Sequence, residues 1–436
     1  MKIRVLSYGL PFAHTLRSAK TSMDVREGWL ICVEGSEGRC GWGDIATWRG
    51  FGSRPGLVRM EVDELLQTPA ILDGLNFESA LDIKAWSENS PFGPETTYGL
   101  ELALLDLMGQ RTSSSIAELL TEDSASSVRS HGLVVGNVVP EYRTLKIKVG
   151  ADSLAEDIAR LKSMRDICGE DKVFRVDAGG AWTEPMAVEA IDEMAALGVE
   201  LIEEPLRPEL RNALPALCAR AAKAGISIAL DESLRSREDL EWAIHEKAAH
   251  AVVLKPLFVG GLFRTLDWAR VAADAGLEVV ITHALESAIG RCGAVHLAAC
   301  VAGVHGLAEP FPEDLAPGLV WQGDCVEVPS LPGLGTVPYT SWLASQASMK
   351  IAESSTGAIP NPLLSSAIAR PEHPALILGD KSLTYDEMCK AVRSRAGSFE
   401  AQGIGPGSKV GLMGPPSLIL IFRKESESEV KNEIQN

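Results

Sequence analysis

Short apolar runs alternate with amphipathic, helix-like stretches from about residue 144 to residue 310, and polar turns separate them. The apolar runs are nearly continuous, which is typical of parallel strands that helices cover on both faces. Seven such strands in series fit a closed barrel better than an open sheet, although the pattern does not exclude a doubly wound sheet. The predicted strands are residues 145–149, 173–178, 200–204, 227–231, 251–255, 278–282 and 305–308.

Local signals mark where the predicted helices begin and end. In the stretches ALGVELIEEP, KAGISIALDE and DAGLEVVITH, a glycine follows the last helical turn and the next strand begins directly after it. Ser153 and Glu156 have the spacing of a capping box at the start of the helix after the first strand. Leu154, Ile158 and Leu161 then recur on one face of that helix, as expected of a helix packed on a sheet.

The two ends of the chain follow other patterns. IRVLSYGLPF, REGWLICVEG and RCGWGDIA are typical of antiparallel strands, and the helical stretch TTYGLELALLDLMGQ comes after them. After about residue 345, SQASMKIAESSTGAIPNP has the composition of a linker. We therefore expect an α+β capping domain over residues 1–120, the barrel over 121–345, and a linker with a separate short appendage over 346–436.

Composition narrows the function classes. The 436 residues include 41 basic and 59 acidic ones, and the net charge of −18 is spread along the chain, which argues against a nucleic-acid partner. The eight cysteines include no C-x-x-C pair and no zinc spacing, as is usual for reduced cytosolic thiols. No apolar run approaches the length of a membrane helix, and the N-terminus reads as a strand rather than a signal peptide. We expect a soluble cytoplasmic protein with no membrane partner.

Charged residues occupy the carboxyl ends of successive predicted strands. An acidic residue at such a place is more often a helix N-cap or a solvated turn residue, but a charged residue at five strand ends in order is unusual. Catalytic groups of parallel barrels lie at these ends, so the sequence predicts an active site there. The residues are Lys146, Lys148, Asp177, Glu203, Glu204, Asp231, Glu232 and Lys255.

This set of residues predicts a particular chemistry. Carboxylates that converge at a barrel mouth repel one another unless a cation neutralises them, and oxygen ligands suit Mg²⁺. One of two lysines flanking the metal can remove the α-proton of a bound carboxylate substrate, while the metal and the other ammonium stabilise the enediolate. A lysine acts as a base only if its pKa falls toward the working pH. Burial and the neighbouring Lys146 cation both favour a lowered pKa for Lys148.

The motifs over residues 1–345 resemble those of the enolase superfamily, specifically its muconate-lactonizing-enzyme subgroup and, within it, the o-succinylbenzoate synthases. The barrel motifs that carry the resemblance are KIK, FRVDAGGAW, IEEP, ALDES, VVLKP followed by GG, THALESAIG and LPGLG. In the N-terminal region they are REGWLICVEG, GWGDIA and GLELALLDLMG. The resemblance implies an α/β fold, a modified (β/α)7β TIM-type barrel with an N-terminal α+β capping domain.

The same resemblance implies roles for the charged residues. Lys148 would be the base, Lys255 the cation opposite it, and Glu204 and Glu232 supporting residues. The implied reaction is the syn dehydration of 2-succinyl-6-hydroxy-2,4-cyclohexadiene-1-carboxylate to o-succinylbenzoate in menaquinone biosynthesis, in which Lys148 also protonates the departing hydroxide. The resemblance implies that Asp177, Glu203 and Asp231 are the ligands of Mg²⁺. Mn²⁺ would be an alternative metal at the same site.

Some residues depart from the family pattern, and other reactions stay open. The family usually has Asn at Gly179, a proline-rich loop at TWRG (47–50) and often Glu at Asp44. The same lysine pair serves N-succinylamino acid racemases and dipeptide epimerases, although GLAEPFPEDLAPGL lacks the Asp-x-Asp of the latter. A base at His283, as in mandelate-racemase-like members, would lack its orienting Asp because Lys255 stands there, so we expect His283 to line the pocket.

Further residues near the predicted strand ends are candidates for holding the substrate, with packing or helix capping as the alternative. Lys146 would help to place the substrate carboxylate. Arg175 shares a strand face with Asp177. The remaining candidates are Gly260, Gly261, Glu286 and Ser287.

Residues 361–417 resemble the start of an adenylate-forming acyl-CoA synthetase, a class that includes o-succinylbenzoyl-CoA synthetase. The motifs are LTYDEM and GIGPGSKVGL, and the chain stops before the phosphate loop and the catalytic lysine domain of that class. We expect a functional link to that enzyme but no adenylation activity. A catalytically idle scaffold is the alternative from another class, and the intact set of buried charges argues against it.

Overall fold

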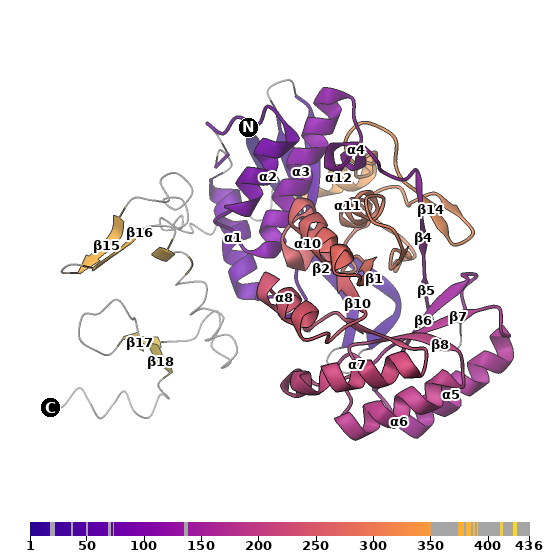
Figure 1. The fold of residues 1–436 in the computed structure, drawn as a ribbon. Coiled ribbons are helices and arrows are strands. Elements are labelled where there is room, and N and C mark those ends of the chain that lie inside the picture. Colours follow the sequence, from indigo (N-terminus) through magenta and orange to yellow (C-terminus); the bar gives the residue numbers. More distant parts are fainter. Residues whose placement is uncertain are drawn as a thin grey trace.

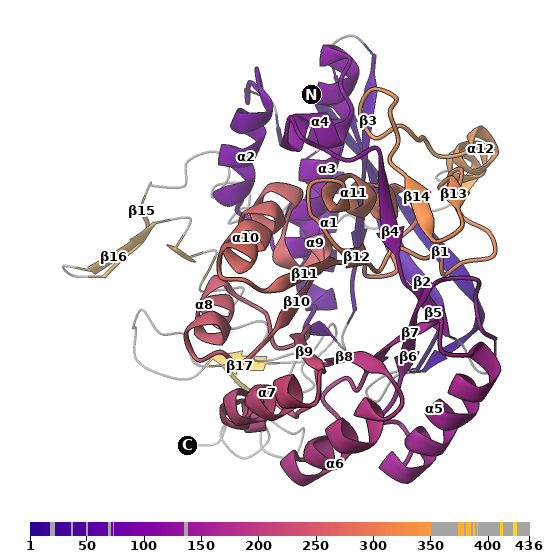
Figure 2. The ribbon, with the colours of Figure 1, turned by 45° about the vertical axis from the view of Figure 1, so that its right-hand side comes forward.

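The N-terminal elements form an antiparallel sheet with helices against it, beside a ring of parallel strands (Figures 1 and 2). The sheet has the order β1 (Lys2–Arg17), β2 (Ser22–Glu34), β3 (Cys40–Ala46), and the helices are α1 (Pro55–Gln67), α2 (Ala80–Glu88), α3 (Pro94–Thr112) and α4 (Ile116–Leu120). The computed structural model describes residues 1–17, 22–35, 38–48, 51–68, 71–72, 74–134, 138–349, 374–378, 381–384, 387–388, 390, 410–412 and 422–424.

Glycine allows α3 to lie directly on β3. A Cβ atom at Gly43 would lie 1.8 Å from the carbonyl oxygen of Gly99, and a Cβ at Gly99 would lie 2.9 Å from the carbonyl oxygen of Asp44. The two backbones therefore meet without side chains between them. This contact fixes the end of β3, which carries Asp44, relative to the long helix that faces the barrel.

The predicted barrel is confirmed. Seven parallel strands have the order β11-β10-β9-β8-β7-β6-β5, and β12 (Val304–His305), parallel to β4 (Ser127–Ser130), closes the ring. His131 N donates to His305 O at 2.8 Å, and Gly306 N donates to Ile281 O at 2.9 Å. The strands of the sheet are β5 (Gly132–Val134), β6 (Thr144–Lys148), β7 (Val173–Asp177), β8 (Val199–Glu203), β9 (Ser227–Leu230), β10 (Ala251–Leu254) and β11 (Glu278–Ile281).

Two strands were missed by the sequence pattern. β4 and β5 are four and three residues long, and the polar Ser130 and His131 interrupt their apolar character. The other strands lie within one residue of the predictions at each end, except that the last predicted strand is only the two residues of β12. Such short strands are defined by their hydrogen bonds to neighbouring strands in the folded protein rather than by their composition.

Helices follow the strands on the outside of the ring (Figure 2). The predicted capping box at α5 is confirmed, because the Ser153 side chain accepts from Glu156 N and the Glu156 carboxylate accepts from Ser153 N. The helices are α5 (Leu154–Cys168), α6 (Glu184–Ala195), the 3₁₀ helix η2 (Pro208–Ala213), α7 (Leu214–Lys223), α8 (Arg237–His245), α9 (Pro256–Val259), α10 (Leu262–Asp274) and α11 (Ala288–Ala298).

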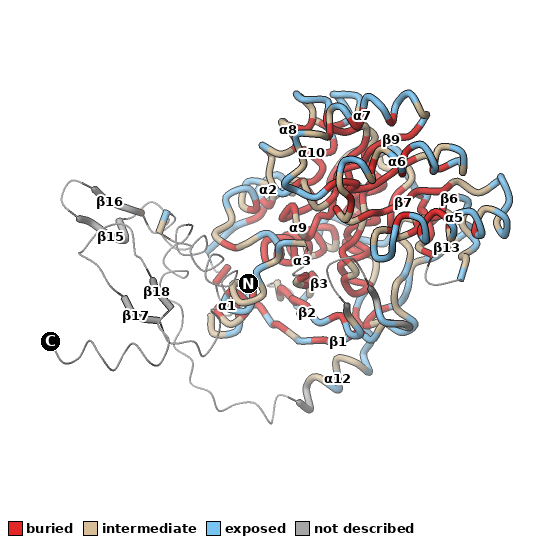
Figure 3. The backbone as a smooth tube through the Cα atoms, turned by 90° about the horizontal axis from the view of Figure 1, so that it is seen from below, coloured by how far each residue is buried: buried red, intermediate tan, exposed pale blue. Residues whose placement is uncertain are grey.

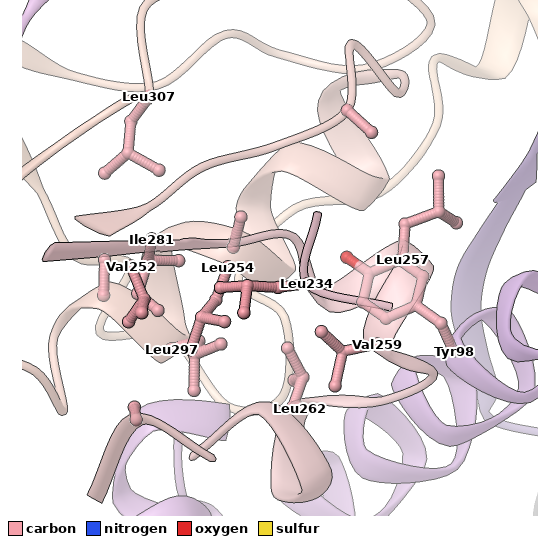
Figure 4. Packing of buried hydrophobic residues seen from close by; sticks show 14 of the residues in the cluster. Tyr98, Leu234, Val252, Leu254, Leu257, Val259, Leu262, Ile281, Leu297 and Leu307 are labelled. Atoms are coloured by element: carbon pink, nitrogen blue, oxygen red, sulfur yellow. The ribbon is translucent and has the colours of Figure 1, made fainter. Parts of the chain in front are cut away.

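Consecutive residues of the barrel strands are buried (Figure 3), although neighbouring side chains along a strand point to opposite faces. Outward-facing Val252 and Leu254 belong to the main core under the helices, together with Ile281 (Figure 4). The alternate residues of the same strand, Ala251 and Val253, belong to a separate cluster inside the ring. Because both faces are covered, the strands read as continuous apolar runs.

The remaining described elements follow the barrel. β13 (Trp321–Gln322) and β14 (Cys325–Glu327) extend the sheet that contains β4, and α12 spans Thr340–Met349. The appendage predicted over 346–436 lies mostly outside the described residues, and its described strands are β15 (Pro374–Leu378), β16 (Lys381–Thr384), β17 (Val410–Leu412) and β18 (Phe422–Lys424). Its likeness to a synthetase stays a prediction. Across the described residues, no helix is long and apolar enough to cross a membrane.

Candidate active site

The two lysines of β6 point into the barrel, as their spacing predicts. Lys146 Nζ donates to both carboxylate oxygens of Glu203 at 2.7 Å and lies 3.1 Å from Asp177 Oδ2. Lys148 Nζ donates to the same Asp177 oxygen at 3.2 Å. The Lys148 side chain is 32% exposed, so it is less buried than the sequence suggested.

The opposite side of the mouth carries the second lysine. Lys255 follows β10, is buried, and its Nζ donates to both oxygens of Asp231, the residue after β9. The strand order places β7, β8 and β9, with their carboxylates, between Lys148 on β6 and Lys255 on β10. The structure thus brings the predicted lysines and metal ligands into one network at the carboxyl ends of five neighbouring strands.

Burial and charge shift the pKa values in this network in opposite directions. Burial alone would lower the pKa of Lys146, but the charges of Asp177 and Glu203 raise it above its usual range. Burial alone would raise the pKa of Asp177, but Lys146 and Lys148 hold it below its usual range. Burial, with the charges of Asp177 and Asp231, raises the pKa of Glu203 to about 8 although Lys146 opposes the shift. Lys146 is therefore a stable cation that organises the carboxylates.

Glu204 and Glu232 lie beside this network. Glu204 has a left-handed backbone (φ 44°), and its carboxylate accepts from Asp231 N at 2.8 Å and Ser233 N at 3.3 Å. It thereby holds the turn that presents Asp231. Glu232 Oε2 is buried without a hydrogen-bond partner, and burial raises the pKa of Glu232 to about 7. A Cβ at Gly179 would lie 4.0 Å from Glu232 Oε1, so the missing Asn side chain leaves space beside this carboxyl group.

The donor set fits a hard divalent cation. The mouth holds three ammonium groups and five carboxyl groups, an excess of two negative charges if all are ionised. All five acidic groups offer oxygen ligands, which Mg²⁺ prefers, and Glu232 Oε2 has no donor. Among the described residues, no three acidic, His or Cys groups are arranged around one point as metal ligands. Lysine ammonium groups lie within hydrogen-bond distance of the predicted ligand oxygens, and a bound cation would take their place.

An aromatic residue that sequence reasoning missed covers Lys255. The Phe51 ring centroid lies 4.2 Å from Lys255 Nζ, within the range of a cation–π contact. Phe51 stacks on Phe258 at 5.5 Å and contacts Trp48 at 4.6 Å, and Arg235 donates to its carbonyl oxygen. The capping domain thus supplies one wall of the site. Two signals in the sequence pointed to this loop, its departure from the family pattern at TWRG (47–50) and its two aromatic residues.

The Gly260–Gly261 turn faces the capping domain. A Cβ at Gly260 would lie 3.1 Å from Pro94 Cα, and one at Gly261 would lie 2.5 Å from Glu101 Oε2. Both residues have positive φ angles, of 94° and 136°. The contacts that demand glycine here are therefore with α3, and the predicted substrate contact stays a prediction.

Arg175 points toward the opposite end of the barrel. Its guanidinium donates to Glu200 Oε1 at 2.6 Å, to Glu278 Oε1 at 2.7 Å and to Val304 O at 3.3 Å. These partners lie at the beginnings of β8, β11 and β12. The geometry favours the packing alternative, and a contact of Arg175 with the substrate stays a prediction.

The loop after β11 is bonded to the capping domain. Ser287 N and Oγ donate to Asp44 Oδ2 at 2.9 and 2.5 Å, and Glu286 Oε2 accepts from Ala284 N. Both ring nitrogens of His283 are occupied, by Ala308 O at 2.9 Å and Leu285 N at 3.1 Å. Burial lowers the pKa of His283 to about 3, so this ring is neutral, and its place in the wall of the pocket stays a prediction. Contacts of Glu286 and Ser287 with a substrate stay predictions.

Comparisons with known proteins agree with the fold. The family described as "Enolase C-terminal domain-like" matches residues 122–341, half of the chain. A hydrophobic dipeptide epimerase of Enterococcus faecalis is 26% identical over 68% of this chain and 86% of its own length. An o-succinylbenzoate synthase of Thermobifida fusca is 26% identical over 76% of this chain and 86% of its own. A muconate lactonizing enzyme of Pseudomonas fluorescens, solved with muconolactone, superposes with a TM-score of 0.71 at 25% identity, covering 79% of this chain and 97% of that one.

Proposed function

Since the chain belongs to the enolase C-terminal domain-like family, we propose that it is a Mg²⁺-dependent o-succinylbenzoate synthase. The observation that carries the proposal is the pair Lys148 and Lys255 on either side of the strand-end carboxylates. A lysine base with a metal-stabilised enediolate is the pattern of enolase-superfamily sites. The relative from Thermobifida fusca supports the choice of reaction.

The residues present can perform a syn dehydration. Asp177, Glu203 and Asp231 would hold Mg²⁺, which supplies positive charge that stabilises the enediolate form of the substrate carboxylate. Lys148, the more exposed lysine, removes the α-proton of 2-succinyl-6-hydroxy-2,4-cyclohexadiene-1-carboxylate. The Lys255 ammonium stabilises the developing negative charge from the other face. Lys148 then returns its proton to the departing hydroxide, so the products are o-succinylbenzoate and water.

The second candidate is an acylamino acid racemase or dipeptide epimerase, and the Enterococcus faecalis relative favours it. A dipeptide epimerase needs free carboxylates to bind the substrate ammonium. Here Glu309 accepts from Leu319 N at 2.8 Å and Asp314 accepts from Arg291 Nη1 at 2.7 Å. Two of the three acidic groups in this segment are thus already bonded, and the segment lacks the Asp-x-Asp of dipeptide epimerases, so we rank dehydration above dipeptide epimerisation.

Kinetics on a panel of substrates tests this proposal. We expect the protein to be inactive after treatment with a chelator, and added Mg²⁺ to restore o-succinylbenzoate formation from the cyclohexadiene substrate. N-succinyl amino acids and dipeptides are assayed beside it for a change of optical rotation. Turnover of those substrates alone would contradict the synthase assignment and support the second candidate.

The proposal carries further expectations about cellular context. We infer a cytoplasmic enzyme of menaquinone biosynthesis that acts on a small carboxylate and whose product an acyl-CoA synthetase consumes. The segment 361–417, which suggested the link to o-succinylbenzoyl-CoA synthetase, lies mostly outside the described residues. Detection of the succinyl-cyclohexadiene substrate accumulating in a deletion strain would test this placement.

A further inference from the structure

Arg26 joins two segments that border the candidate site. It lies on β2, is 1% exposed, and donates from Nε to Leu285 O at 3.1 Å and from Nη2 to Ala284 O at 3.0 Å. Its Nη1 donates to Thr47 O. The first two acceptors belong to the barrel loop after β11, and the third belongs to the capping domain just after β3. One buried side chain thus ties the two domains together.

Both segments that Arg26 binds are connected to the surroundings of Lys255. Thr47 directly precedes Trp48, whose ring lies 5.8 Å from the Arg26 guanidinium and contacts Phe51. Phe51 in turn covers Lys255 Nζ. On the barrel side, the loop continues β11, which pairs with β10, the strand that Lys255 follows. Arg26 therefore lies behind the aromatic wall of the site rather than in it.

The barrel loop needs this support. Leu285 has a φ of 59°, a left-handed conformation that is unfavourable for a residue with a Cβ atom. Its carbonyl is one of the Arg26 acceptors, and the following Ser287 is held by the buried Asp44. Asp44 also accepts from Tyr8 Oη at 2.8 Å. The capping domain thus imposes the shape of this loop through two side chains.

We propose that Arg26 is a positioning residue, which holds the Trp48–Phe51 wall and the 284–285 backbone together so that the Phe51 ring stays on Lys255. Arginine suits this task because its rigid planar group carries five N–H donors, enough to bind three carbonyl oxygens in fixed directions. A lysine has a single charged nitrogen on a flexible stem and cannot replace it. The catalytic consequence rests on the proposed function, because it requires Lys255 to be a reacting group, but the conformational consequence does not.

Hydrogen exchange tests the conformational part without substrate. Phe51 N donates to Trp48 O at 3.0 Å and Leu285 N donates to His283 Nδ1, so both segments contain protected amides. In Arg26→Met and Arg26→Lys we expect exchange in the peptides containing Phe51 and Leu285 to accelerate by about tenfold or more. Unchanged exchange in both peptides would overturn the proposal, and Arg26→Lys keeps the test available if Arg26→Met does not fold.

The matched control is Arg165→Met. Arg165 likewise donates to backbone carbonyls, of Leu197, Gly169 and Lys172 at 2.7–3.0 Å and of Gly198 at 3.4 Å, and lies over the Phe174 ring at 3.7 Å. It lies near the beginning of β7, at the opposite end of the barrel strands. We expect Arg165→Met to leave both site peptides unchanged. Equal acceleration in this variant would assign the Arg26 effect to general destabilisation and contradict the proposal.

A double-mutant cycle tests the catalytic part. If Arg26 acts through Phe51, Arg26→Lys and Phe51→Leu each lower kcat by about tenfold, and the double variant is no slower than either single one. Independent effects, which multiply to a loss of about a hundredfold, would overturn the proposal. If the wild type racemises N-succinyl amino acids instead of forming o-succinylbenzoate, the same cycle is run on that substrate, since both reactions use Lys255. Failure of the proposed function is thus distinguished from failure of the role of Arg26.

Discussion

Lys148 and Lys255 differ in their surroundings at the level of single residues. The Lys148 side chain is 32% exposed and contacts one oxygen of Asp177, whereas that of Lys255 is 9% exposed and lies between Asp231 and the Phe51 ring. Access to solvent suits a group that must release and accept protons. A carboxylate and a ring face both stabilise a cation, which suits the electrophilic role. The asymmetry supports the proposed division of roles.

Substitution of Lys148 tests this division most directly. Lys148→Ala should lower kcat by at least about a thousandfold, because general acid–base catalysis by a positioned group contributes on that order. It should also abolish exchange of the substrate α-proton with solvent deuterium, followed by NMR. Lys162→Ala, which removes a lysine that is 55% exposed on α5, is the control and should behave as the wild type. Undiminished exchange in Lys148→Ala would rule out Lys148 as the base.

The contact between α3 and the barrel illustrates what elements contribute. Glu101 reaches from α3 to the N-terminus of α10, where its Oε1 accepts from Leu262 N at 2.5 Å and Phe263 N at 3.1 Å. Tyr98, one turn earlier, donates to Gly290 O at 2.7 Å on α11. One helix of the capping domain therefore orders two helices of the barrel, and the turn Gly260–Gly261 gives it room.

Glu101→Gln should flatten the pH dependence of stability. Burial raises the pKa of Glu101 to about 7, so between its unfolded value of 4.5 and pH 7 the native state binds more protons than the unfolded state. The free energy of unfolding therefore falls as pH rises through this window, by at most about 1.4 kcal/mol per pH unit for one group. Glutamine does not titrate, so the variant lacks this part of the decline. Urea unfolding of both proteins from pH 5 to pH 8 measures the difference.

Glu238→Gln is the matched control, since Glu238 lies exposed in the first turn of another barrel helix, α8. Its pKa is lowered by the backbone N–H groups of the helix start, so its stabilisation is lost only as pH falls, below the window measured. The control should reproduce the wild-type slope. Parallel slopes for Glu101→Gln and the wild type would show that Glu101 does not titrate as described.

Gly43→Ala should destabilise the contact between β3 and α3. The added methyl would meet the Gly99 carbonyl oxygen at 1.8 Å, which forces the helix away from the strand. We expect a loss of at least about 3 kcal/mol in the free energy of unfolding, at the upper end for overpacking because the clash is with backbone. Gly9→Ala on β1 meets only Val25 Cγ1 at 3.4 Å and should change stability by less than about 1 kcal/mol. Similar losses for both variants, from denaturant titrations, would exclude this explanation.

At the scale of the whole molecule, the site is assembled from both domains. The barrel supplies the lysines and carboxylates, and the capping domain supplies Phe51 and the two residues, Arg26 and Asp44, that hold the loop after β11. Five carboxyl groups crowd the mouth, and burial together with their mutual repulsion raises the pKa of Glu203 to about 8 and that of Glu232 to about 7. A cation that binds only the native state would favour their ionised forms and stabilise the whole chain.

Mg²⁺ should therefore raise the melting temperature. At a concentration a hundred times its Kd, a ligand that binds only the native state adds about 2.7 kcal/mol, which corresponds to a rise of several degrees. Asp177→Asn and Asp231→Asn should lose most of this rise. Asp192→Asn, which removes an exposed carboxylate on α6, should keep it. Scanning calorimetry at constant ionic strength measures the effect, and equal rises in all four proteins would exclude this metal site.

The periodicity of the chain predicted most of the barrel. Continuous apolar runs located β6 to β11 because strands covered on both faces cannot tolerate alternation, and a capping box located the start of α5. The charged residues at the strand ends were also visible, since parallel strands in series bring their carboxyl ends to one rim. β4 and β5 were missed because three or four residues carry too little pattern to identify a strand.

The sequence by itself determined the barrel, its family and the order of lysines and carboxylates around its mouth. The strands follow from local pattern, and parallel strands in series bring their carboxyl ends to one rim in every such barrel. Only the tertiary structure decided that Arg175 points to the far end of the barrel, that Gly260 and Gly261 face α3, and that Ser287 bonds to Asp44. It alone placed Phe51 on Lys255 with Arg26 behind it. These contacts join residues up to 259 positions apart, and no local pattern records which distant side chain fills a given space.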